Sequence, residues 1–314
     1  MTLLSDSGSS VLRAIGQLLI VVYCYDNVCH QMKSVLTGNG AGFISRRYLC
    51  SSIEKTSTSE SRRFLGRIMP VCLGTDRTGT IEFRILTEDR IEDALAVQQY
   101  SMRQECIAIG MGMYEEPGAP EEMQLIFREV IKDGCTVIAV DRSDRVIAVS
   151  FNKLHTPPQP EEIDPFAFFV ENNIKHRSCR DLIEFIDDVE SQVDIFQKYS
   201  ARAAMEIFYI GTDPKCQERG IGREITEKSL EVARGLRARK LQQIRVADKI
   251  VNEHVRPEVA FAVAASTFSQ RIMEKLGFET LAEVRYEDYV RADRKMSERI
   301  GNAHKTARLT ARKL

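Results

Sequence analysis

The stretch 217–222 (Gln-Glu-Arg-Gly-Ile-Gly) contains the residues of this chain that are best suited to bind a ligand. The apolar run 207–210 before it predicts a buried strand, and apolar residues at helical spacing over 221–240 predict a helix. A turn between a strand and a helix leaves backbone N–H groups unpaired, and the helix dipole adds positive potential there. Gly220 and Gly222 allow a close approach to the backbone because they carry no Cβ. The stretch therefore predicts a phosphate-binding turn, although glycines that only reverse the chain would give the same pattern.

Two widespread phosphate-binding motifs fit this stretch less well. A P-loop needs Gly-Lys followed by Ser or Thr, and none follows Gly222. A dinucleotide fingerprint needs a third glycine or alanine, where this chain has Ile225. Asp248 nevertheless supplies an acidic residue after a further expected strand, of the kind that binds a ribose hydroxyl. A dinucleotide-binding oxidoreductase therefore stays open as a less favoured alternative.

The composition argues against several classes of protein. The 314 residues are 43% hydrophobic and 28% charged, which is ordinary for a soluble globular protein. A formal net charge of −1 gives no reason to expect nucleic acid or an anionic membrane as a partner. The 8 cysteines include no C-x-x-C pair and the 5 histidines no H-x-x-x-H pair, so neither a disulfide framework nor a metal site is expected.

Residues 1–78 differ from the rest of the chain. They are rich in Ser, Thr and Gly, and their one apolar run is too short to span a bilayer. The segment 27–53 contains Lys33, Arg46 and Arg47 but no acidic residue, which is typical of a mitochondrial transit peptide. A secretory signal or a disordered leader also fits this composition. We therefore predict a leader that is disordered or resembles a transit peptide, on a protein that is cytoplasmic or, if the leader directs import, mitochondrial.

Folded structure is expected over residues 79–314. Apolar periodicity and turn residues predict strands at 81–85, 135–140, 146–151, 207–210, 241–246, 279–285 and 306–312, and helices at 87–102, 121–132, 182–189, 221–240 and 266–276. Local hairpins combined with one strand–turn–helix crossover predict a single α+β domain with a mixed sheet.

Two motifs at the expected order and separation narrow the interpretation. Gln217-x-x-Gly220-x-Gly222 after a strand resembles the acetyl-CoA signature of the GNAT superfamily of N-acetyltransferases. The segment 273–278 (Met-Glu-Lys-Leu-Gly-Phe) is similar to the late helix of that superfamily, which usually ends Tyr-Glu-Lys-x-Gly-Phe. The long insert 155–203 and the serine-bearing segment before the late helix resemble more closely the invertebrate arylalkylamine N-acetyltransferase-like group. The resemblance covers residues 79–314 and implies the GNAT fold, a mostly antiparallel twisted sheet flanked by helices.

The resemblance also implies a reaction. It implies acetyl transfer from acetyl-CoA, without a metal, to a small primary amine of the arylalkylamine or polyamine type. The glutamate near the end of the first helix that this group uses as general base is matched by Glu105, although the proline that follows it in the group is absent here. Of the two serines implicated beside it, Ser269 matches the second, whereas Ala265 replaces the first and Ser266 stands one place on. The tyrosine of the late helix is Met273 here, so a catalytically inactive CoA-binding module stays an alternative.

The implied acetyl-CoA site lies on the strand and the glycine turn. Backbone N–H groups of the strand would bind the thioester oxygen, and those of the turn would bind the pyrophosphate. Arg219 or Arg223 would add charge-assisted hydrogen bonds to the phosphates. The residues of this expected site are Ile210, Thr212, Gln217, Glu218, Arg219, Gly220, Ile221, Gly222 and Arg223. A small amine is the expected partner, and the sequence indicates no oligomeric state.

Overall fold

The computed structural model describes residues 70–314 apart from 159–163, 247–249 and 292. The acid-poor segment on which the transit peptide prediction rests lies outside the described residues, and so does Asp248. None of the described helices has the length and apolarity that crossing a bilayer requires.

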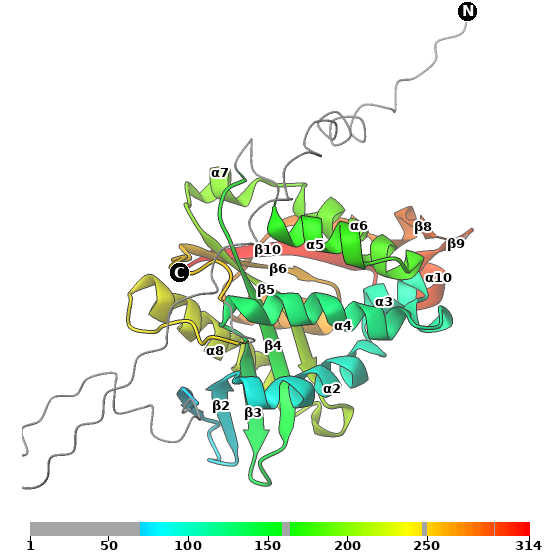
Figure 1. Ribbon diagram of the computed structural model, residues 1–314. Coiled ribbons are helices and arrows are strands. Elements are labelled where there is room, and N and C mark those ends of the chain that lie inside the picture. The colour runs from blue at the N-terminus through cyan, green and yellow to red at the C-terminus, as the bar shows by residue number, and fades with distance from the viewer. Residues whose placement is uncertain (1–69, 159–163, 247–249, 292) are drawn as a thin grey trace, which may run out of the picture. The chain divides into compact units, whose positions relative to one another are not determined.

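An eight-stranded sheet forms the centre of the described part, in the order β1-β2-β3-β4-β5-β6-β10-β7 (Figure 1). Its strands are β1 (Cys72–Thr75), β2 (Ile81–Ile85), β3 (Val137–Asp141), β4 (Val146–His155), β5 (Ala204–Thr212), β6 (Val259–Ala264), β7 (Glu279–Arg285) and β10 (Thr306–Lys313). Neighbouring strands pair antiparallel except β5 and β6, which are parallel. The short strands β8 (Val290–Arg291) and β9 (Arg294–Lys295) pair separately. The predicted mixed α+β fold with a mostly antiparallel sheet is confirmed.

Helices cover both faces of this sheet. They are α2 (Ile91–Met102), α3 (Cys106–Met111), α4 (Ala119–Val130), α5 (Pro165–Asn173), α6 (Arg177–Glu190), α7 (Ile195–Tyr199), α8 (Ile221–Arg237), α9 (Thr267–Lys275) and α10 (Met296–Ile300). Short 3-10 turns lie at Glu88–Arg90, Met113–Glu115, Ile131–Asp133, Pro214–Cys216 and Tyr286–Asp288.

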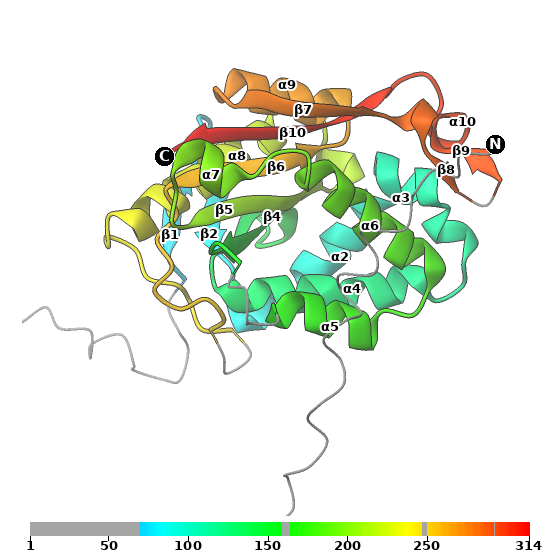
Figure 2. The ribbon, with the colours of Figure 1, turned by 90° about the horizontal axis from the view of Figure 1, so that it is seen from above.

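Contacts along β4 assign the helices to their faces. Phe127 of α4 packs on Phe151 with ring centroids 4.7 Å apart, whereas Ser229 of α8 accepts a hydrogen bond from the neighbouring Asn152. Consecutive residues of a strand point to opposite faces, so α4 and α8 cover opposite sides of the sheet. A Cβ built on Gly222 of α8 would lie 3.3 Å from Ile272 of α9, which places these two helices on the same side. Figure 2 shows α9 on the far side of the sheet from α4 and α5.

A buried polar network attaches α8 to the sheet. Asn152 Nδ2 donates to the carbonyl of Cys135 at 2.8 Å and to Ser229 Oγ at 3.1 Å. Ser150 Oγ donates to Asn152 Oδ1, and the hydroxyls of Ser229 and Ser150 lie 2.9 Å apart. Each of these polar groups is fully buried, so each depends on the others for its hydrogen bonds.

Two differences from the predicted elements have physical causes. β1 precedes the expected start of the fold and pairs with β2. The strand predicted over 241–246 is wrong, because only Val246 makes a strand-like bridge. In that segment Ile244 N–H donates to the carbonyl of Gly134, and the Gln243 side chain donates to the carbonyl of Asp133. The segment is therefore bound to the loop before β3, and β6 takes the sheet position that follows α8.

The polar network generates a stability prediction. Asn152→Ala should lower the free energy of unfolding by about 1–3 kcal/mol, because the remaining buried groups lose partners that water cannot replace. Urea denaturation of the full chain measures this loss. Asn172→Ala is the matched control, since that side chain bonds only the carbonyl of Phe168 on an exposed helix, and its effect should stay within about 0.5 kcal/mol. Equal effects of the two substitutions would contradict the role given to the network.

Candidate active site

A gap opens in the sheet between β5 and β6. Their parallel pairing comprises Ala204–Val259, Met205–Ala260 and Glu206–Phe261, whereas β5 continues to Thr212. Beyond Glu206, β5 is paired with β4 on one side only. Its other edge therefore presents backbone N–H and C=O groups along which an extended ligand can bind.

A β-bulge lies at the start of this open edge. Tyr209 pairs with Phe151 and Ile207 with Asn152, so Phe208 is an extra residue on β5. The bulge turns the rings of the consecutive residues Phe208 and Tyr209 toward the face of the sheet that α4 covers. Phe127 of α4 contacts both of them, with centroids 5.7 Å from Phe208 and 5.3 Å from Tyr209. The bulge thus coincides with the place where β5 leaves β6.

The glycine turn lies beyond the other end of the open edge, between β5 and α8. Glu218 and Gly220 have positive φ values of 62° and 81°, and Gly220 is the N-cap of α8. In the part of the chain that the structure describes, the backbone N–H groups of 217–222 have no hydrogen-bond acceptor. Because α8 is 17 residues long, its dipole adds positive potential at this end. The turn therefore combines unpaired N–H groups with positive potential, and phosphate binding there stays a prediction.

Of the polar side chains around the turn, Gln217 is hydrogen-bonded to another element, whereas two arginines form no ion pair within the described residues. Gln217 Nε2 donates to Gln104 Oε1 at 3.1 Å, which connects the turn to the residues that follow α2. Arg219 is exposed and Arg223 is half-buried in the first turn of α8. Neither arginine forms an ion pair with any described residue. Both guanidinium groups are thus available to an anion at the turn.

Glu105 lies between α2 and α3 and caps α3. Its Oε1 accepts from Ile107 N–H at 3.0 Å and its Oε2 accepts from Ala108 N–H at 2.7 Å. Burial raises the pKa of Glu105, and the hydrogen bonds from the backbone lower it only in part, so the net shift is upward. A carboxylate with a raised pKa is a stronger proton acceptor than an ordinary surface glutamate.

Two tyrosines that border the gap are electrostatic neighbours of Glu105. Its charge adds to burial in raising the pKa of Tyr209 on β5 and that of Tyr286 after β7. Tyr209 Oη lies 2.9 Å from Ser101 Oγ, and Tyr286 Oη donates to the carbonyl of Ala265, which directly follows β6. The end of α2 that leads to Glu105 is therefore bonded to β5 through Ser101.

Ser266 and Ser269 form a capping box at the start of α9. Ser266 Oγ accepts from Ser269 N–H at 3.1 Å, and Ser269 Oγ accepts from Ser266 N–H at 3.0 Å. Ser269 Oγ also lies 2.9 Å from the carbonyl of Ser266. Both hydroxyls thus satisfy backbone groups of their own helix, which directly follows the end of β6. Met273, at the position of the expected tyrosine, is buried in the core.

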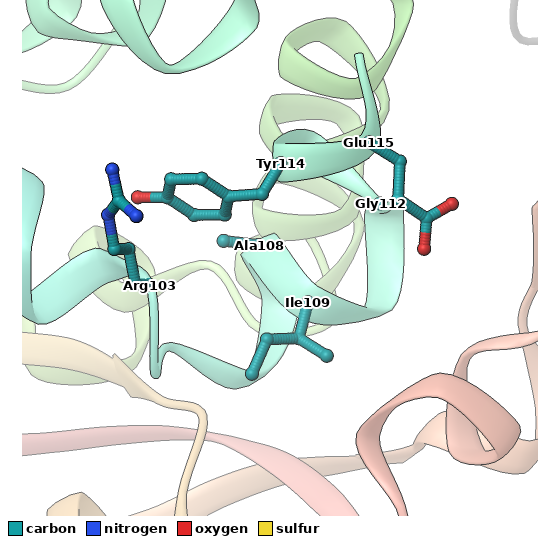
Figure 3. Close-up of a pocket in the computed structure, with 6 residues that line it drawn as sticks. All are labelled: Arg103, Ala108, Ile109, Gly112, Tyr114 and Glu115. Carbon is teal, nitrogen blue, oxygen red and sulfur yellow. The ribbon is translucent and has the colours of Figure 1, made fainter.

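A separate hollow of about 270 Å³ lies beside α3 (Figure 3). Its lining residues are Arg103, Ala108, Ile109, Gly112, Tyr114 and Glu115. Figure 3 shows the Tyr114 side chain extending toward Arg103, whose guanidinium carbon lies 5.5 Å from the ring centroid. No residue predicted for catalysis or for acetyl-CoA binding lines this hollow.

Sequence reasoning missed several groups around the gap. These are the hydroxyls of Tyr209 and Tyr286 and the carboxyl of Glu206. Glu206 had a detectable signal, because it is a charged residue inside the otherwise apolar run 203–210. In the described part of the chain no three His, Cys, Asp or Glu side chains are arranged to hold a metal ion.

The chain has the fold of insect amine N-acetyltransferases of known structure. Arylalkylamine N-acetyltransferase 2 from Aedes aegypti matches with a TM-score of 0.57 and 17% identity, over 74% of this chain and 98% of that one. A mosquito arylalkylamine N-acetyltransferase like 5b matches with a TM-score of 0.55 and 15% identity, over 75% and 100%. The Drosophila melanogaster polyamine N-acetyltransferase, an enzyme that catalyses the formation of N-acetylagmatine, matches with a TM-score of 0.53 and 15% identity, over 74% and 100%. No protein-family model matches the chain. The resemblance inferred from the two motifs is confirmed at the level of the fold.

The capping box generates a second stability prediction. Ser266→Ala should lower the free energy of unfolding by about 1 kcal/mol, because the first turn of α9 loses its side-chain acceptor. Ser266→Asp should preserve most of the stability, since aspartate is an equally good N-cap residue. Thermal unfolding of the full chain compares the two variants. Equal destabilisation by both substitutions would contradict the claim that Ser266 stabilises the protein by capping α9.

Proposed function

We propose that the protein is an N-acetyltransferase that transfers the acetyl group of acetyl-CoA to a small primary amine. One observation carries this proposal: a single strand, β5, has an open edge, leads into a turn of free N–H groups and is bonded to the segment that precedes a glutamate with a raised pKa. The fold is shared with enzymes whose names state arylalkylamines and polyamines as substrates. The open edge and the turn would bind the acetyl-CoA donor, and the glutamate would activate the amine acceptor.

The donor would lie along β5. The N–H groups of 217–222 would bind the pyrophosphate, and Arg219 or Arg223 would contribute charge-assisted hydrogen bonds. The pantetheine arm, which carries amide groups, would bond to the open edge that includes Ile210 and Thr212. A backbone N–H near the bulge would then donate to the carbonyl oxygen of the thioester as negative charge develops there.

The acceptor would react on the face that carries Glu105. A primary alkylamine is mostly protonated at neutral pH and must lose a proton before its nitrogen can attack the thioester carbon. The Glu105 carboxylate would take this proton, directly or through a water molecule. The nitrogen lone pair forms the new C–N bond, the C–S bond breaks with its electron pair leaving on the CoA thiolate, and the thiolate takes up the second proton that the amide nitrogen releases. Ser266 and Ser269 would support this reaction by fixing the start of α9 beside the gap.

Substitution of Glu105 tests the function. Glu105→Gln should lower kcat/KM for an accepted amine by about 100-fold or more, because it removes the proton acceptor. In the parent protein the rate should fall as the pH falls through the pKa of Glu105, since the base is then protonated. That acid limb should lie at higher pH than the ordinary glutamate value of 4.5 and should be absent from the variant. Release of CoA thiol across an amine panel measures both effects.

The control for this experiment is Glu115→Gln. Glu115 is an exposed carboxylate that pairs with Arg299, and its loss should leave both the rate and the pH profile unchanged. Full activity of Glu105→Gln would remove Glu105 as the base. An absence of CoA release with every amine, in a protein that binds CoA, would favour the inactive CoA-binding module instead.

A further inference from the structure

The residues that follow α2 are attached both to β5 and to the glycine turn. Ser101 Oγ lies 2.9 Å from Tyr209 Oη, and Gln104 Oε1 accepts a hydrogen bond from Gln217 Nε2 at 3.1 Å. Glu105 directly follows Gln104. The segment that leads to the glutamate is therefore bonded to the strand with the open edge and to the turn beyond that strand.

The attachment to β5 is buried and closely packed. Ser101 and Gly211 are both buried, and a Cβ built on Gly211 would overlap with Ser101 Oγ and lie 2.9 Å from the Tyr209 ring. The end of α2 can therefore lie this close to β5 only because residue 211 has no side chain. This packing fixes the start of the segment 101–105 over the strand.

The attachment to the turn is exposed and is made by the side chain of Gln217. Its Nε2 donates to Gln104 Oε1 and also lies 3.4 Å from the carbonyl oxygen of Thr212, the last residue of β5. One amide group thus bridges the end of the strand, the turn and the residue before Glu105. Because Gln104 and Gln217 are both exposed, their hydrogen bond contributes little to the stability of the fold.

Backbone hydrogen bonds connect the position of Gln104 to that of Glu105. The N–H of Gln104 donates to the carbonyl of Ser101 at 3.1 Å. The N–H of Glu105 donates to the carbonyl of Met102 at 3.0 Å. Beyond this turn, the Glu105 carboxylate is bonded to the first N–H groups of α3. A displacement of Gln104 would therefore move the carboxylate as well.

We propose that Gln104 and Gln217 are positioning residues, whose hydrogen bond sets the place of Glu105 relative to the glycine turn. The inference rests on the proposed function, and neither side chain needs to touch the reacting atoms. Phosphates bound at the turn would place the acetyl group, whereas Glu105 would deprotonate the amine, so the turn and the base must keep a fixed separation. A misplacement of about 1 Å can slow a reaction on the order of 100-fold, so a hydrogen bond of modest strength has a measurable kinetic effect.

Gln104→Met tests this link, because methionine has nearly the length of glutamine but no amide oxygen. At saturating acetyl-CoA it should lower kcat for an accepted amine by about 3- to 10-fold, the factor that corresponds to one hydrogen bond of ordinary strength. The midpoint of thermal unfolding should shift by less than about 2 °C, which separates positioning from a loss of stability. Gln104→Glu keeps an acceptor for Gln217 and should retain kcat, while its negative charge beside the turn should raise the KM for acetyl-CoA.

A double-mutant cycle with Gln217→Ala separates one shared link from two independent effects. In the Gln217→Ala background, Gln104→Met should change kcat by less than about 2-fold, because the hydrogen bond is already absent. Calorimetric titration of CoA should give the same pattern in Kd, since a turn without its attachment must be ordered when CoA binds. Gln192→Ala is the control, because the Gln192 amide donates to the carbonyl of Asp188 in α6, and it should leave kcat and Kd unchanged.

The outcomes distinguish a failure of the link from a failure of the proposed function. With an active enzyme, a kcat of Gln104→Met equal to that of the parent would overturn the proposal, and so would effects that multiply in the double variant. If no amine is acetylated, the proposed function itself fails. The same cycle measured on the Kd of CoA then decides on the link, and multiplying effects, or none, would overturn it.

Discussion

The early end of the parallel pairing between β5 and β6 is the constraint on which the rest of the structure depends. Both strands are covered by helices, yet they share three residue pairs before they separate. The bulge at Phe208 changes the direction of β5 at that point, while β4 stays paired with it. One strand thereby serves three purposes along its length. It has an acidic closed end at Glu206, an open edge beyond the bulge, and a turn of free N–H groups that follows it.

Hydrogen bonds hold the elements around the gap in place, which is what a site for acyl transfer needs. The hydrogen bonds of Asn152 with Ser229 hold α8, and therefore the turn at its N-terminus, against β4. Glu105 is fixed because its carboxylate caps α3, so the same interactions position the group and moderate its pKa. The capping box of Ser266 and Ser269 fixes α9 where β6 ends.

Local sequence signals predicted much of the fold, and the site residues that they suggested stay predictions. The glycine turn, its helix and the late helix have short-range signatures, and their resemblance to a known superfamily implied a mostly antiparallel sheet flanked by helices. β6 was missed because Val259–Ala264 is a continuous apolar run without periodicity, while the 241–246 segment had the propensity of a strand but found its partners in a loop. The S-x-x-S spacing of Ser266 and Ser269 does resemble a capping box and could have been interpreted that way.

Hydrogen–deuterium exchange of the full chain, with and without acetyl-CoA, tests the central claim most directly. The N–H groups of 217–222 have no acceptor in the described structure and should exchange rapidly in the free protein. Acetyl-CoA should slow exchange in peptides that cover 207–212 and 217–223, while peptides from β1 and β2, at the far edge of the sheet, stay unchanged. NAD at the same concentration should leave all of these peptides unchanged. Equal protection by NAD, or protection by acetyl-CoA confined to other parts of the chain, would contradict the account of β5 and its turn as the donor site.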